Sequence, residues 1–164
     1  MKDNDFEIRD GTSEDADVYV EFFMESAIYH SQLDNRFQYT DELAEMVKGI
    51  YTSQCDSEDS WTGFAILGTR IVGYITALIR ERGPIHETRK IGFIEGLYVK
   101  PDVRGQGIGN SLWMKALQWL ENRRIGIIHL SVASENPIAN DFWRNKGFRP
   151  FMYQMEINLE NEKR

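Results

Sequence analysis

The spacing of apolar residues switches along the chain between a period of two and a period of three to four, which predicts strands interleaved with helices. Polar N-cap residues, Thr12 or Ser13 and then Thr40, mark the starts of the first two helices. The predicted strands cover residues 6–9, 61–67, 71–80, 90–99, 125–132 and 151–159, and the predicted helices run from 12 or 13 to about 30, 40 to about 51, 107 to about 123 and 136 to about 146. This order predicts an α/β (α+β) fold.

Turn residues show how the middle strands connect. Gly68, Thr69 and Arg70 join two β-rich runs as a hairpin, and the break at 83–84 precedes a third run, so three antiparallel strands in a row are expected. Gly96 lies inside the third of these strands, where a glycine often marks a bulge or a close backbone approach. We expect a bulge there, although a merely weak strand position is the alternative.

Length and composition indicate an ordinary globular chain. The 164 residues, 41% of them apolar and 27% charged, fit a single domain over 1–164 without internal repeats or a linker. Apolar stretches fall far short of the roughly 20 residues of a membrane helix, and no signal pattern opens the chain. The single cysteine, Cys55, excludes an internal disulfide framework, and a cytoplasmic location is expected.

The net charge of the chain indicates which classes of binding partner it favours. A formal net charge of −7 and a pI near 5.0 disfavour nucleic acid and anionic membranes, and no basic patch is visible in the sequence. A cationic acceptor would be attracted. The three histidines, His30, His86 and His129, show no metal-ligand spacing, so no metal site is expected.

The segment from Arg104 to Gly109, Arg-Gly-Gln-Gly-Ile-Gly, carries the clearest chemistry. It lies between a predicted strand and a predicted helix, where glycine backbone and helix N–H groups can converge on phosphate oxygens. A Walker loop would need a lysine, which Gly109-Asn110-Ser111 does not supply, and a Rossmann fingerprint would need glycine where Asn110 stands. A glycine turn without a ligand explains Arg104 and the helix start less well.

These residues resemble the phosphate-binding signature of the GNAT superfamily of acyl-CoA N-acyltransferases, Arg/Gln-x-x-Gly-x-Gly/Ala, with Arg104, Gly107 and Gly109 in the signature positions. The likeness covers about residues 91–148. It includes Leu97-Tyr98-Val99 followed by Pro101, and Leu130-Ser131-Val132 with Asn136, Ala139, Phe142, Trp143, Gly147 and Phe148. The resemblance implies a mixed, mostly antiparallel central sheet, splayed between its fourth and fifth strands and flanked by helices.

The resemblance also implies a cofactor site for acetyl-CoA. The pantetheine arm would lie along the fourth strand, held by backbone groups of Leu97 and Val99, and the pyrophosphate would lie on the glycine loop. Asn136 would contact the pantetheine or cap its helix, and Phe142 with Trp143 would pack there. The expected cofactor-binding residues are Leu97, Tyr98, Val99, Arg104, Gly105, Gln106, Gly107, Ile108, Gly109, Asn110, Asn136, Phe142 and Trp143.

Acetylation of an amine requires a base, because alkylamines are protonated at neutral pH. Glu95, a charged residue inside an apolar strand, is the leading candidate, and pairing with Arg80 or Arg82 is the competing interpretation. The family often protonates the leaving thiolate with a tyrosine at the position of Trp143. Since indole is not an acid at neutral pH, Tyr98 or solvent would take that role.

The sequence therefore predicts an N-acetyltransferase that acts by direct attack of a primary amine on acetyl-CoA. The acceptor, a small amine or a peptide N-terminus, would lie near the first two helices, where Tyr29, His30, Phe37 and Tyr39 could line its cleft. A CoA-binding module without catalysis and a nucleotide-binding protein are the alternatives. Exposed sheet edges make a homodimer plausible.

Overall fold

The computed structural model describes residues 6–37 and 39–159 and contains two compact units. In the described part of the chain, the first unit, Met1–Ser131, holds five strands and three α-helices, and the second, Val132–Arg164, holds the fourth α-helix. That one domain spans 1–164 stays a prediction.

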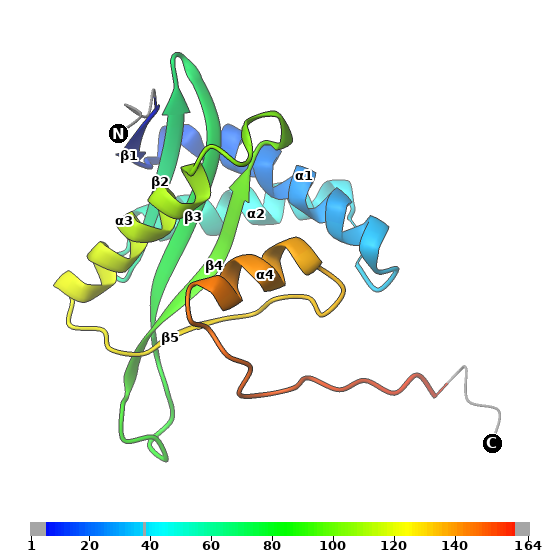
Figure 1. Ribbon diagram of the computed structural model, residues 1–164, viewed down its shortest axis with the longest axis vertical. Helices are drawn as coiled ribbons and strands as arrows, with labels where there is room; N and C mark the ends of the chain where they lie inside the picture. The colour runs from blue at the N-terminus through cyan, green and yellow to red at the C-terminus, as the bar shows by residue number, and fades with distance from the viewer. Residues whose placement is uncertain (1–5, 38, 160–164) are drawn as a thin grey trace. The chain divides into compact units, whose positions relative to one another are not determined.

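The five strands form one mixed sheet in the order β1-β2-β3-β4-β5. The strands are β1 (Phe6–Asp10), β2 (Ser60–Leu67), β3 (Arg70–Glu81), β4 (Lys90–Val99) and β5 (Ile128–Leu130). Neighbouring strands are antiparallel except β4 and β5, which are parallel. The hairpin between β2 and β3 and the run of three antiparallel strands are therefore confirmed (Figure 1).

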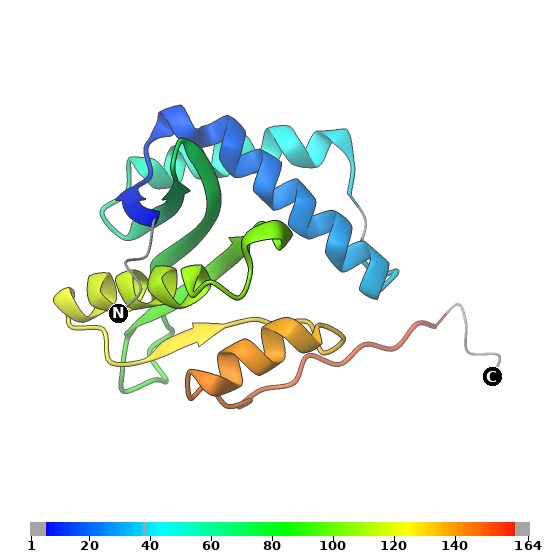
Figure 2. The ribbon, with the colours of Figure 1, turned by 45° about the horizontal axis from the view of Figure 1, so that its top comes forward.

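Three helices flank this sheet in the first unit. They are α1 (Ala16–Leu33), α2 (Asp41–Cys55) and α3 (Ile108–Asn122), and short 3-10 turns at Ser13–Asp15 and Pro101–Val103 precede α1 and α3. Figure 2 shows α1 and α2 together on one side of the strands and α3 on the other. In the second unit, α4 (Pro137–Asn145) follows an Asn136 N-cap.

The predicted start of the first helix has a clear structural cause. Thr12 and Asp15 form a capping box, in which the Thr12 backbone N–H donates to Asp15 Oδ2 at 2.8 Å. Arg9 of β1 also donates to both carboxylate oxygens of Asp15, at 2.6 and 2.8 Å. These contacts hold the pKa of Asp15 below its ordinary value, the Arg9 hydrogen bond being the largest cause. They join the start of the helical segment to the sheet.

Aromatic side chains fill the space between α1, α2 and the sheet. Tyr19 of α1 stacks on Tyr51 of α2 with ring centroids 4.3 Å apart, and lies 4.8 Å from the ring of Tyr74 on β3. Phe22 and Phe64 are fully buried in the same cluster. This packing fixes the two helices over the face of β3 and β4, which carries the candidate site.

Two predictions at the C-terminal side were wrong in extent or in kind. The strand predicted over 125–132 has only the three residues of β5, because the N–H of Ile125 donates instead to Leu120 O at the end of α3. The strand predicted over 151–159 is not formed in the described part of the chain. Alternating apolar and polar residues do not make a strand by themselves, because a strand also needs a hydrogen-bonded neighbour. In this segment the Tyr153 and Met155 side chains are instead 82% and 90% exposed.

Candidate functional site

Strand β4 carries a bulge at Glu95. Thr76 of β3 pairs with Gly96, and the next residue, Ala77, pairs with Ile94, so that Glu95 is an additional residue opposite β3. The bulge expected at Gly96 is therefore confirmed, with the additional residue being Glu95, one position before Gly96.

The same strand leaves part of its other edge open. It pairs with β5 only through Gly92, Phe93 and Ile94. From Glu95 to Val99, β4 has no β5 partner among the described residues, so the sheet separates at this point. The splay between the fourth and fifth strands begins at the bulge.

Backbone direction decides which groups of β4 face the opening. The N–H of Lys100 donates to Val72 O of β3 at 2.8 Å. Because backbone groups of successive strand residues point to opposite sides, Leu97 and Val99 direct their N–H and C=O groups away from β3. Consistently, Val99 O accepts a hydrogen bond from Arg104 Nε at 2.8 Å rather than from β3. Leu97 and Val99 thus offer their backbone to an extended ligand.

The glycine loop after β4 has the backbone that a phosphate cradle needs. Gly105 and Gly107 have φ of +79° and +86°, which L side chains rarely adopt, and within the described residues no atom lies within 4 Å of a Cβ built on either. Gly107 is the N-cap of α3, and Ser111 N donates to its carbonyl. The N–H groups of Ile108 and Gly109 precede this bond and point out of the helix start.

Arg104 adds a fixed positive charge beside this loop. Its guanidinium lies 5.8 Å from the ring centroid of Tyr98 and donates to Val99 O, so its exposed side chain is held against the end of β4. Gln106 and Asn110 are also exposed. The structure therefore brings the predicted loop residues together with the open end of β4.

Glu95 lies on the side of the sheet that α1 and α2 cover. Gln54 of α2 donates from Nε2 to Glu95 Oε2 at 2.7 Å, and Arg80 Nη2 lies 3.6 Å from Glu95 Oε1. Of the two expected arginine partners, Arg80 is therefore the one in place, and Arg82 donates to Thr88 O instead. The Glu95 side chain keeps 30% of its surface exposed, so a ligand can still reach the carboxylate.

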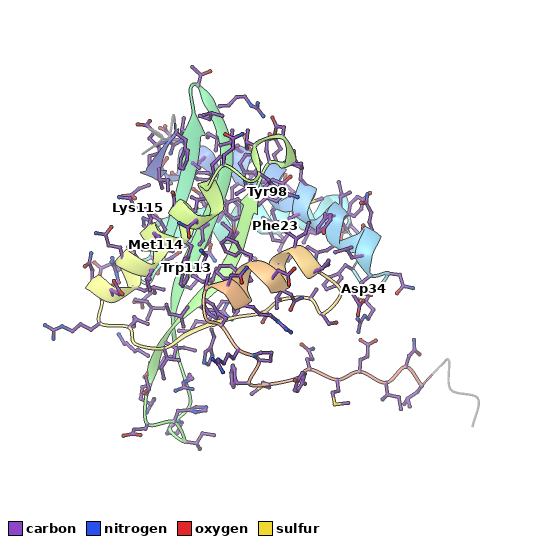
Figure 3. The ribbon with its side chains drawn as sticks, in the orientation of Figure 1. Phe23, Asp34, Tyr98, Trp113, Met114 and Lys115 are labelled. Atoms are coloured by element: carbon purple, nitrogen blue, oxygen red, sulfur yellow. The ribbon has the colours of Figure 1, made fainter. Side chains whose placement is uncertain are left out.

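Tyr98 is directed at α1 rather than at the opening. Its hydroxyl donates to Glu25 Oε2 at 2.5 Å, and Lys100 Nζ lies 3.2 Å from Glu25 Oε1. Tyr98 belongs to the aromatic cluster under α1, with Phe23 packed against it at the edge (Figure 3). Burial and the hydrogen bond to Glu25 raise the pKa of Tyr98 above its ordinary value, and thus make it a weaker acid.

The four aromatic residues expected near an acceptor lie around the C-terminal end of α1. Tyr29 and His30 have ring centroids 6.0 Å apart, and His30 lies 5.5 Å from Phe37, whereas Tyr39 is 48% exposed. Burial lowers the pKa of His30, which favours its neutral form. His30, Tyr29 and Phe37 therefore form one small group.

The second unit holds three of the predicted cofactor residues. Asn136 Oδ1 accepts from the N–H of Ala139 at 3.1 Å, so its interpretation as a helix cap is confirmed. Phe142 and Trp143 meet edge to face at 4.9 Å, and Trp143 meets Phe148 at 5.3 Å. These contacts give Trp143 a packing role within its own unit.

The sequence pattern missed the partners that hold the site residues. Gln54 is 41 positions before Glu95, and Glu25 is 73 positions before Tyr98. Both stand on helix faces where a polar residue is ordinary, so no local signal marks them. Only tertiary packing brings them to β4.

Among the described residues, no group of three or more His, Cys, Asp or Glu side chains could hold a metal ion. Within the same part of the chain, no helix combines the length and apolar character that crossing a membrane requires.

Sequence comparison finds one family model and two related proteins. The model of the acetyltransferase (GNAT) family matches residues 25–148. An uncharacterised N-acetyltransferase of Archaeoglobus fulgidus is 29% identical over 87% of this chain and 92% of its own length. An uncharacterised N-acetyltransferase of Methanocaldococcus jannaschii is 39% identical to this chain over the matched residues. That match covers 38% of this chain and only 27% of the length of the Methanocaldococcus jannaschii protein.

Solved structures share the fold. A tetramutant of the BH1408 protein from Bacillus halodurans superposes with a TM-score of 0.84 at 20% identity, over 93% of this chain and 99% of that protein. A predicted acetyltransferase from Clostridium acetobutylicum, solved with acetyl-CoA, has a TM-score of 0.75 at 16% identity, over 97% and 99% of the two chains. At these identities the likeness establishes the fold alone.

Proposed function

Because the chain belongs to the acetyltransferase (GNAT) family, we propose that it transfers the acetyl group of acetyl-CoA to a primary amine by direct attack. The observation that carries this proposal is the junction of an open strand edge with a glycine loop at a helix start. Leu97 and Val99 lie on the edge, and Gly105 and Gly107 shape the loop.

The residues present fit a CoA molecule. A backbone with positive φ at Gly105 and Gly107, and open space where a Cβ would stand, suits the approach of phosphate oxygens to main-chain N–H groups. Arg104 would neutralise part of the phosphate charge. The backbone of Leu97 and Val99 would hold the pantetheine arm, and bound acetyl-CoA would supply the activated acetyl thioester.

The chemistry proposed for this chain starts at Glu95. The Glu95 carboxylate takes a proton from the acceptor ammonium, directly or through water, and the freed nitrogen then attacks the thioester carbonyl carbon. A C–N bond forms and the C–S bond breaks, so the electron pair leaves with the thiolate. The second proton that the nitrogen loses passes to solvent, which in turn protonates the thiolate. Gln54 holds one carboxylate oxygen at 2.7 Å and so fixes the direction of the base.

We assign the proton of the leaving thiol to solvent rather than to Tyr98. The raised pKa of Tyr98 disfavours proton loss, and its hydroxyl already donates to Glu25. A tyrosinate formed there would face the Glu25 carboxylate. Tyr98 thus acts as a positioning residue that joins β4 to α1.

The strongest competing proposal is a CoA-binding module that has no catalysis. Trp143, which stands where the family often has a tyrosine, favours it, since indole cannot donate a proton at neutral pH. Both proposals require CoA binding, so only turnover separates them. Loss of one acid does not exclude catalysis, because a thiolate is already a fair leaving group.

Two classes of acceptor are compatible with the proposed acetyl transfer: small-molecule amines and peptide N-termini. Tyr29, His30 and Phe37 would border the acceptor. A homodimer through exposed sheet edges stays a prediction.

Replacing Glu95 with Gln tests the base. The change keeps the shape of the side chain and removes its basicity, so we expect turnover to fall about 100-fold or more with little change in CoA affinity. Glu81→Gln is the matched control, because Glu81 lies on β3 with a 65% exposed side chain paired to Arg89. An unchanged pH–rate profile in Glu95→Gln would count against the assignment.

A further inference from the structure

Arg80 of β3 presents a guanidinium that is fixed in place but makes no hydrogen bond among the described residues. Its Cζ lies 3.6 Å from the ring centroid of Phe93, so the planar group stacks on that ring. Its nearest carboxylate oxygen, Glu95 Oε1, is 3.6 Å from Nη2, which is beyond hydrogen-bond range. The side chain is 45% exposed.

Other arginines of the same unit use their donors within the chain. Among the described residues, seven of them make hydrogen bonds to carboxylates or backbone carbonyls: Arg9, Arg36, Arg70, Arg82, Arg89, Arg104 and Arg123. Arg80 instead keeps its donors beside the proposed base. A guanidinium held by stacking is well prepared to bind a planar carboxylate through two parallel N–H groups.

The neighbouring groups limit what such a ligand can be. Glu95 and Arg80 place a negative and a positive group 3.6 Å apart, and Gln54 occupies the opposite carboxylate oxygen. A ligand that binds both residues therefore needs a positive group and a negative group about as close to each other as Glu95 and Arg80 are. An α-amino acid has its ammonium and its carboxylate on one carbon. An α-amino acid with an uncharged side chain has no net charge, so the −7 charge of the chain does not repel it as it would a purely anionic ligand.

We propose that the acceptor is of the α-amino-acid class, with its carboxylate on Arg80 and its reacting amine at Glu95. This inference rests on the proposed acetyl transfer and names the acceptor for the same site. Phe93 holds the Arg80 fork flat, and Glu95 receives the ammonium proton. An amine without a neighbouring carboxylate would leave the Arg80 donors unused and bind more weakly.

The test compares matched acceptors. Each of the common α-amino acids is assayed with acetyl-CoA beside its α-carboxamide, which keeps the amine and the side chain and removes the charge. We expect kcat/KM for at least one amino acid to exceed that of its amide on the order of 10- to 100-fold, chiefly through KM. Amides that react as well as the acids, or simple amines that react when no amino acid does, would overturn the proposal.

Variants at Arg80 connect this preference to the residue. Arg80→Gln should remove the advantage of the acid over the amide, and Arg80→Lys, which keeps a charge without the planar fork, should remove most of it. Arg70→Gln is the control, because Arg70 stands on the same strand with a 56% exposed side chain paired to Asp102. A preference that survives in folded Arg80→Gln and Arg80→Lys, as judged by circular dichroism, would refute the assignment.

Binding separates this inference from the proposed function. Saturation-transfer NMR with CoA present should detect the amino acid with the unmodified chain and not with Arg80→Gln. If no amine turns over but this binding difference holds, acetyl transfer fails and the Arg80 site stands. If amines turn over but amino acid and amide bind alike, the Arg80 site fails and acetyl transfer stands.

Discussion

Substitution of Gly107 by Val tests the phosphate cradle through a single added side chain. Gly107 has φ of +86°, so an L side chain there costs about 1–2 kcal/mol of folding free energy. Apart from Gly107 and its neighbours along the chain, no described atom lies within 4 Å of the added Cβ, so this atom clashes with no other part of the described structure. The same Cβ stands at the helix start, where phosphate oxygens would approach the N–H groups.

The expected loss of CoA affinity follows from those hydrogen bonds. Each bond to a charged oxygen contributes about 1.5–3 kcal/mol, so losing two of them predicts a rise in the CoA Kd of about 100-fold or more. Isothermal titration with CoA measures the affinity, and urea unfolding measures the folding cost.

Gly68→Val is the matched control for backbone strain. Gly68 has φ of +62° in the turn between β2 and β3, and its Cβ position is equally open in the described structure. Both variants should lose similar folding free energy, and only Gly107→Val should lose CoA binding. The assignment of this loop as the phosphate-binding site would be refuted if Gly107→Val binds CoA as well as the unmodified chain, or if Gly68→Val weakens CoA binding equally.

Two further predictions concern residues that hold the site. Tyr98→Phe removes the 2.5 Å hydrogen bond to Glu25 and should cost about 1.5–3 kcal/mol of unfolding free energy, while kcat changes less than about threefold; a loss of 100-fold or more would restore Tyr98 as the acid. Asp15→Asn should cost about 2 kcal/mol at neutral pH, and because the folded pKa of Asp15 is lowered, the difference from the unmodified chain should shrink as pH falls below about 4. Asp17→Asn is the control: because its side chain is 87% exposed, it should leave the unfolding free energy and the pH dependence of that energy unchanged. A cost of Asp15→Asn that does not depend on pH would contradict the ion pair between Arg9 and Asp15.

Local sequence signals were sufficient for much of the first unit. The strand over 90–99 was predicted with its observed bounds, because its β-rich run is bounded by turn residues on both sides. Gly96 and Gly107 were informative because their backbone requirements, a bulge and a positive φ, are properties of single residues. Such requirements leave a mark in the sequence whatever the rest of the fold is.

Long-range contacts left no comparable mark. The alternation over 151–159 predicted a strand, but a strand depends on a partner that the segment itself does not specify. Gln54 and Glu25 reach the site from α2 and α1, and polar residues there are equally expected on a solvated surface. The substrate side of the site is therefore the part that the structure adds.

The most direct test of acetyl transfer measures thiol release from acetyl-CoA together with the mass of the acceptor, across amines that include the α-amino acids. We predict that at least one amine becomes N-acetylated in an amount equal to the thiol released, and that Glu95→Gln suppresses both signals together. CoA binding with no release above the uncatalysed rate for any amine would contradict acetyl transfer and identify the chain as a CoA-binding module.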